Sequence, residues 1–247
     1  DKSSFSQQTL MELLIEDLEY KELICGEPSE HRDISEWNGI ELDANDEVVT
    51  IDWGYTFESR ISGTFNIQWL PSTLLDCVLE TKMFHGSIDT AQLPRQLQSL
   101  FIHNNNFIGE CSIADLPETL EYLHAFRNKL TGTLDLTTMP KRMKELDLGS
   151  NAFHGTLCLK HLPESLTALW VTDNRLSGSV DLTSLPHEME ALGLGVNDFC
   201  GETDFSRLPS TLLHLGVECT SLSGEIFRSK MDENFDLLRE RSQVRVV

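Results

Sequence analysis

Basic residues are scarce in this sequence, because its 19 Lys and Arg face 40 Asp and Glu and leave a formal net charge of −21. An acidic body repels phosphate groups, so we expect neither nucleic acid nor an anionic membrane as a partner. The natural complement is a protein partner with a basic surface. Long apolar runs are also missing, and none approaches the ~18 residues that a membrane span needs.

Closely spaced cysteines are absent as well. The six cysteines form no CxxC pair, so the sequence supports no zinc site, and we predict no metal ligands. None of the eleven asparagines lies in an N-x-S/T sequon. Unpaired thiols and missing sequons both favour an intracellular protein, with the cytoplasm preferred and an organelle left open.

A repeat of fixed length organises most of the chain. Between successive Leu-Pro or Met-Pro pairs the sequence follows the pattern LPxxLxxLxLxxNxLxGxLxLxx. A fixed period over so many copies predicts a solenoid, in which each turn buries its apolar side chains against its neighbours. The pairs recur every 23 residues, at Leu70-Pro71, Leu93-Pro94, Leu116-Pro117, Met139-Pro140, Leu162-Pro163, Leu185-Pro186 and Leu208-Pro209.

One turn shows the expected physics. A short strand over 168–172 places Leu169 and Val171 inward and their neighbours outward, and stacked turns then form a parallel sheet. At the corner after the strand, an asparagine side chain is expected to satisfy backbone groups of adjacent turns. This column comprises Asn105, Asn128, Asn151, Asn174 and Asn197.

These motifs resemble the leucine-rich-repeat family over residues 47–227. The LxGxL continuation, as in 130–134, is similar to the plant-type subclass, and the Asp-Leu return, as in 135–136, is similar to repeat proteins of protists. The resemblance implies an α/β-type right-handed solenoid of about eight turns. It also implies a parallel β-sheet on the concave side and partner binding on that face.

The two ends are expected to form caps. Residues 1–46 would be an N-terminal cap with a helix over about 8–23, and Trp37-Asn38-Gly39-Ile40 resembles a plant-type cap. Secreted relatives carry a cysteine pair beside that tryptophan, whereas this chain has none, which favours an intracellular relative. Residues 228–247 would be a short C-terminal cap or tail. There 231–241 could form a helix, and 243–247 could form a last strand or a partner contact.

The outward positions of the concave sheet carry the candidate binding residues. Rigid aromatic side chains with polar neighbours are typical interface anchors. Alternatively, the rings stack on one another under a terminal segment. At the far end, Gly193, Gly195 and Gly216 would leave bare backbone for a closely approaching chain. The predicted partner-binding set is Phe101, His103, Tyr122, His124, Phe126, Arg127, Glu145, Asp147 and Trp170.

No catalytic residue or cofactor is expected. His124 and Asp147 could lie on neighbouring strands, but no nucleophile accompanies them. We therefore predict a non-enzymatic protein-protein interaction module, an adaptor or scaffold that binds through its concave face. Two alternatives stay open: a constitutive structural subunit of a large multi-protein complex, and an extracellular recognition domain.

Overall fold

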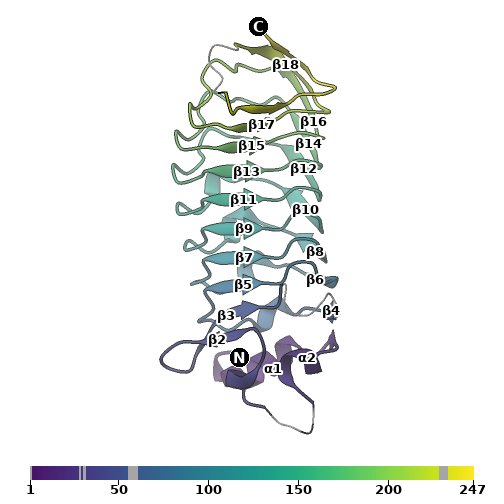
Figure 1. Ribbon diagram of the computed structural model, residues 1–247, viewed down its shortest axis with the longest axis vertical. Coiled ribbons are helices and arrows are strands. Elements are labelled where there is room, and N and C mark those ends of the chain that lie inside the picture. Colours follow the sequence, from purple (N-terminus) through teal and green to yellow (C-terminus); the bar gives the residue numbers. More distant parts are fainter. Residues whose placement is uncertain (1, 28, 30–31, 55–60, 228–232) are drawn as a thin grey trace. The chain divides into compact units, whose positions relative to one another are not determined.

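The computed structural model describes residues 2–27, 29, 32–54, 61–227 and 233–247. The chain is a solenoid of about eight turns with parallel sheets and few helices, as the repeat predicts (Figure 1). It forms two compact units, and each is described by itself. Unit 1 comprises residues 1–111 and 115–130, and unit 2 comprises 112–114 and 131–247.

Each turn of unit 1 contributes one strand to a front sheet and one to a back sheet. The front strands come from the LxxLxL segment and run parallel, except for β2, which pairs antiparallel with β3. The front sheet contains β2 (Ile40–Leu42), β3 (Val48–Asp52), β5 (Asp76–Val78), β7 (Ser99–Phe101) and β9 (Tyr122–His124). The back sheet contains β1 (Leu18–Glu19), β4 (Ser62–Thr64), β6 (Phe84–Ser87) and β8 (Asn106–Glu110).

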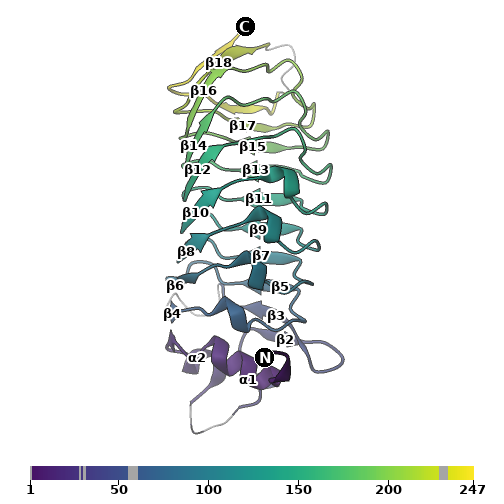
Figure 2. The same cartoon turned by 180° about the vertical axis from the view of Figure 1, so that it is seen from behind.

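Unit 2 repeats this arrangement with parallel pairs throughout. Figure 2 shows its back strands side by side. The front sheet contains β11 (Glu145–Asp147), β13 (Ala168–Trp170), β15 (Ala191–Gly193), β17 (His214–Gly216) and β19 (Asp236–Leu238). The back sheet contains β12 (Ala152–Thr156), β14 (Arg175–Gly178), β16 (Asp198–Glu202), β18 (Ser221–Ile226) and β20 (Gln243–Val246), and residues 131–133 of β10 (Lys129–Thr133) pair with β12.

The asparagine column does what the sequence predicted. Asn105 is buried, and its side-chain oxygen accepts hydrogen bonds from the backbone N–H groups of Lys82 and Phe84 at 3.3 and 2.9 Å. Its amide nitrogen donates to the carbonyls of Leu79 and Ile102 at 2.8 and 3.0 Å. One side chain therefore satisfies four backbone groups in two successive turns.

The second sheet was not part of the sequence-based prediction. Its inward positions hold the fully buried rings of Phe84, Phe107, Phe153 and Phe199 or the leucines of the same column. The glycine two residues later has a positive φ in every turn, and Gly86 (φ 136°) shows why. A Cβ there would lie 2.8 Å from the carbonyl oxygen of Phe65, so only glycine permits the close approach.

An aspartate closes several turns of the chain locally. The Asp89 carboxylate accepts from the N–H of Ala91 and caps the 3₁₀ turn η5 (Thr90–Gln92). Asp135 does the same for η7 (Leu136–Thr138). In unit 2, Asp181 accepts from both the hydroxyl and the N–H of Thr183, and these bonds, with a contribution from Lys160, lower the pKa of Asp181 to about 2.

The N-terminal cap differs from the single helix expected over 8–23. Helix α1 (Gln7–Leu14) ends early, and the chain turns so that Leu18 pairs with Gly63 in β1 and β4. A second short helix, α2 (Glu22–Cys25), follows. The long-helix prediction is wrong because Leu18 and Glu19 pair with β4 at the edge of the back sheet, and this pairing outweighs the helical period.

The rest of the cap follows its expected order. Trp37 and Trp53 are buried, and their indole N–H groups donate to the carbonyls of Arg32 and Asn38. In the first strand of the repeats Val48 is buried and Val49 is half-buried. Residues 55–60, directly before Ile61, lie outside the described residues.

The C-terminal end contains strands where a helix was expected. Residues 236–238 form β19, which pairs with β17, and Leu238 is exposed. The start of the expected helix at Met231 lies outside the described residues. Of the two alternatives for 243–247, the strand is present, because β20 pairs with β18. The predicted division of the chain into an N-terminal cap (1–46), a repeat region (47–227) and a C-terminal cap or tail (228–247) stays a prediction.

A strained corner in unit 2 yields a stability prediction. The residue before each asparagine of the column has a positive φ, and at Val196 (φ 52°) that residue is β-branched and 40% exposed. Because left-handed backbone costs L-residues roughly 1–2 kcal/mol and asparagine tolerates it best, Val196→Asn should raise the free energy of unfolding by about 1 kcal/mol. Thermal denaturation checks this, with the reverse change Asn104→Val (φ 55°) as the matched control. A melting temperature that falls in Val196→Asn would contradict the assignment of strain.

Candidate binding face

The outward columns of the front sheet have the register that the repeat predicted. In unit 1, Asp76, Ser99 and Tyr122 are aligned across β5, β7 and β9. Val78, Phe101 and His124 form the next column. The predicted binding residues of this unit therefore come from adjacent strands of one face.

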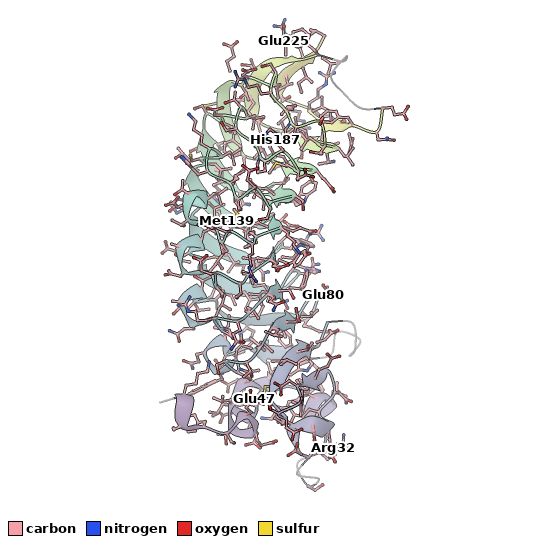
Figure 3. All side chains as sticks on the ribbon, turned by 90° about the vertical axis from the view of Figure 1, so that its left-hand side faces the viewer. Arg32, Glu47, Glu80, Met139, His187 and Glu225 are labelled. Carbon is pink, nitrogen blue, oxygen red and sulfur yellow. The ribbon has the colours of Figure 1, made fainter. Side chains whose placement is uncertain are left out.

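The His103 cluster, defined as Glu80, Phe101, His103, His124 and Phe126, brings four rings and one carboxylate together on this face. The rings of His103 and Phe126 stack at 4.5 Å with an interplanar angle of 9°. Phe101 and His124 meet edge to face at 4.8 Å. Nε2 of His103 lies 2.9 Å from Oε2 of Glu80, whose residue is only 7% exposed and which Figure 3 labels. All four rings are half-buried, and each phenylalanine of the cluster contacts a histidine.

The electrostatics of this cluster favour a neutral His103. Burial lowers the pKa of His103, the Glu80 carboxylate opposes that shift, and His124 adds to it. Nδ1 of His103 is buried and has no hydrogen-bond partner in the described part of the chain. The Glu80 carboxylate, in contrast, already has a partner in His103, so this cluster satisfies its own acidic group.

Two further predicted residues of unit 1 lie at the margins of the cluster. Tyr122 is half-buried in the first outward column. Arg127 is not on the sheet: it occupies the positive-φ corner (φ 53°) and is exposed. It can reach a ligand at the edge of the face but does not belong to the packed surface.

In unit 2 the predicted residues Glu145, Asp147 and Trp170 all lie on the front face and are half-buried. Asp147 aligns with Trp170 across β11 and β13, and its carboxylate accepts from the N–H of Gly149 at 3.0 Å. The indole of Trp170 lies directly on Gly193, where an added Cβ would collide with ring atom Cε3. The same indole meets the ring of His214 at 4.7 Å, tilted by 45°.

The expected strip of bare glycine backbone is wrong as stated, because the chain's own side chains cover parts of it. Trp170 covers Gly193, and the carboxylate of Glu218 lies on Gly195, where a Cβ would collide with both its oxygens. A Cβ on Gly216 would lie 3.0 Å from Oε2 of Glu218. Glycine in these strands therefore accommodates neighbouring side chains laid flat on the sheet.

Sequence reasoning left out several residues that complete these clusters. Glu80 and Glu218 occupy the same outward column, but only the structure shows that one is paired and the other is not. His214 lies between Trp170 and Asp236, with its Nδ1 3.0 Å from Oδ2 of Asp236. A histidine aligned with an acidic residue on the next strand was the available signal for this contact.

Other potential chemistry is limited in the described part of the chain. All six cysteines are free, and burial raises the pKa of Cys77 well above its usual range and that of Cys111 to about 12. No group of three His, Cys, Asp or Glu side chains there could hold a metal ion. Nor does any helix among those residues have both the length and the apolar character for crossing a membrane.

Comparison with solved structures decides the type of solenoid. The leucine-rich-repeat ectodomain of the plant membrane receptor kinase GASSHO1/SCHENGEN3 from Arabidopsis thaliana, in complex with CASPARIAN STRIP INTEGRITY FACTOR 2, superposes with a TM-score of 0.70 at 20% identity. The match covers 98% of this chain and 29% of that one. The fold is a leucine-rich-repeat solenoid.

Two other leucine-rich-repeat matches agree. The PEPR1–AtPEP1 complex has a TM-score of 0.69 at 20% identity and covers 97% of this chain and 42% of that one. The Arabidopsis receptor kinase HAESA, in complex with the peptide hormone IDA and the co-receptor SERK1, has a TM-score of 0.54 at 20% identity, with 96% and 50% covered. The chain thus spans half or less of these proteins. No protein-family description and no curated protein matches its sequence.

Proposed function

We propose that this leucine-rich-repeat chain is a non-catalytic recognition module that binds a segment of a partner protein along its front sheet. The observation that carries the proposal is the half-buried rings on the outward columns within each unit, His103 with Phe126 in unit 1 and Trp170 with His214 in unit 2. Such rings lose little conformational entropy on binding and combine apolar area with polar edges.

Charge favours a basic partner segment. The chain carries a net charge of −21, and acidic side chains such as Asp76, Glu145 and Asp147 lie on the front face among the rings. Complementary charge would steer such a segment toward this face and hold it in register.

Among the settings considered for such a module, the extracellular recognition domain has more support than the intracellular adaptor. One solved neighbour is described as the ectodomain of a membrane receptor kinase in complex with CASPARIAN STRIP INTEGRITY FACTOR 2, and another is a receptor kinase in complex with a peptide hormone. The missing cap cysteines and sequons had favoured the adaptor. No observation on the described residues specifically favours the constitutive subunit of a large complex.

The proposal predicts a binding loss without unfolding. Peptides selected from a random twelve-residue display library on the wild-type protein should bind Trp170→Ala at least about 30-fold more weakly, since anchor truncation costs about 2 kcal/mol or more. Calorimetry measures the affinity, and thermal denaturation checks the fold.

The matched control is His154→Ala, which removes an exposed ring from the back sheet of the same unit. It should leave the affinity unchanged. Failure to select any peptide, or an equal loss in both variants, would contradict binding through the front sheet.

A further inference from the structure

Unit 2 contains an acidic group that its own fold leaves unsatisfied. Oε2 of Glu218 is buried and has no hydrogen-bond partner among the described residues. In unit 1, Glu80 occupies the same column of the repeat, and its Oε2 is paired with His103 at 2.9 Å. In unit 2 the place of His103 is taken by Glu240, because the N–H of Cys219 donates to the carbonyl of Glu240 as that of Thr81 does to the carbonyl of His103. A second carboxylate offers Glu218 no hydrogen-bond donor.

The surroundings of Glu218 form a niche with a glycine floor, which we call the Trp170 niche: Trp170, Gly193, His214, Gly216 and Glu218. A Cβ on Gly216 would lie 3.0 Å from Oε2 of Glu218 and 3.7 Å from Nε2 of His214, so both atoms border the space above this glycine. The indole of Trp170, lying on Gly193 and against His214, forms an aromatic wall.

The niche presents hydrogen-bond acceptors rather than donors. The carboxylate of Asp236 can only accept, so Nδ1 of His214, 3.0 Å away, carries the proton of this contact. In the neutral ring Nε2 is then an acceptor, and it faces the same space as the acceptor oxygen of Glu218. Two acceptors, one of them anionic, beside an aromatic face suit a planar cation with several N–H groups.

The geometry points to an arginine side chain of the bound partner segment as the occupant of the Trp170 niche. The guanidinium would donate to Oε2 of Glu218 and to Nε2 of His214 and stack on the indole of Trp170. Because Oε2 is buried against the glycine floor, this binding requires the Glu218 carboxylate to rotate toward the guanidinium. This inference rests on the proposed function, since it names the partner residue that the front sheet of unit 2 recognises.

The test uses a single residue as probe. N-acetyl-arginine methylamide is titrated into the full chain while the indole N–H signal of Trp170, identified by its loss in Trp170→Phe, is followed by NMR. N-acetyl-citrulline methylamide, which has the same shape without the charge, is the ligand control. We expect a saturable shift with a dissociation constant in the millimolar range for arginine, and binding at least about fivefold weaker for citrulline.

Variants separate the two acceptors from a general charge effect. E218Q should weaken arginine binding at least about fivefold, and H214F, which keeps a ring against Trp170, should also weaken it. E225Q removes an exposed carboxylate from the back sheet of the same unit and should leave binding unchanged. Circular dichroism confirms that each variant is folded.

Three results would overturn the inference: no saturable shift, equal binding of arginine and citrulline, or unchanged binding in both E218Q and H214F. These failures are distinguishable from failure of the proposed function. If selected library peptides depend on Trp170 but contain no arginine, binding along the front sheet is supported. Only the inference that an arginine occupies the Trp170 niche is then wrong.

Discussion

Asn197→Ala is expected to lower the free energy of unfolding of unit 2 by about 3 kcal/mol, because several buried backbone groups lose their partner at once. The Asn197 oxygen accepts from the N–H of Leu176 at 3.0 Å. Its amide nitrogen donates to the carbonyls of Val171, Leu194 and Gly195 at 2.9, 3.1 and 3.1 Å. Alanine can replace none of these bonds, and the 7% exposure of Asn197 leaves little access for water.

Thermal denaturation with hydrogen exchange measures this effect, and exchange should accelerate first in the turns around β14 and β16. Asp198→Ala, which changes the adjacent exposed side chain, is the control and should be nearly neutral. If Asn197→Ala has the same melting temperature as the wild type, the asparagine column does not stabilise the fold.

Phe153→Ala is expected to cost about 3–5 kcal/mol, the largest effect of any substitution considered for this chain. Phe153 is fully buried in β12, and its N–H donates to the side-chain oxygen of Asn174 at 3.0 Å. Removing the ring leaves a cavity inside a turn that is stable only through contact with its neighbours.

The control for Phe153→Ala is its neighbour His154→Ala, which points outward from the same strand and should change stability by less than about 0.5 kcal/mol. Denaturant titration of both variants provides the comparison. Equal stabilities of the Phe153→Ala and His154→Ala variants would contradict the assignment of Phe153 to the inward face of β12 and His154 to its outward face.

The repeat made most of this fold predictable. Its period fixed the register of the front strands, since an inward Leu169 requires Ala168 and Trp170 to face outward, and the structure has that pattern. The same reasoning could have found the back sheet: in 130–134 the residues Leu130 and Gly132 alternate with Thr131 and Thr133, and β10 covers them. The glycine there obscured the strand signal, because glycine weakens strands in general.

The ends were less predictable because they lie outside the repeat. Leu10, Leu14 and Leu18 are all buried and share a helical spacing, yet Leu18 is buried as part of a strand. Its partner, Gly63, is 45 residues away. No local pattern encodes that pairing. At the C-terminus, β19 and β20 continue the sheets although the repeat motif has stopped, because pairing with β17 and β18 satisfies strand edges that would otherwise be open.

The candidate site was predictable in position but not in detail. The outward columns placed Phe126 and Trp170 on the binding face, whereas their contacts depend on side-chain directions. Trp170 could lie flat only because Gly193 is next to it. Oε2 of Glu218 has no hydrogen-bond partner among the described residues, because Glu240 occupies the place that His103 has beside Glu80. Arg127 was included in the predicted set because it follows Phe126 in the sequence. It lies at the positive-φ corner after the strand, so its closeness in sequence did not place it on the sheet.

The central claim, that a partner segment binds along the front sheet, is tested most directly by mapping where a selected library peptide contacts the folded chain. Amide and indole NMR signals are recorded with and without the peptide. We expect the shifts to concentrate on front-sheet residues such as Ala168, Trp170 and His214, with back-sheet residues such as His154 and Ser177 unchanged. Shifts confined to the back sheet, with the Trp170 indole unmoved, would contradict the claim.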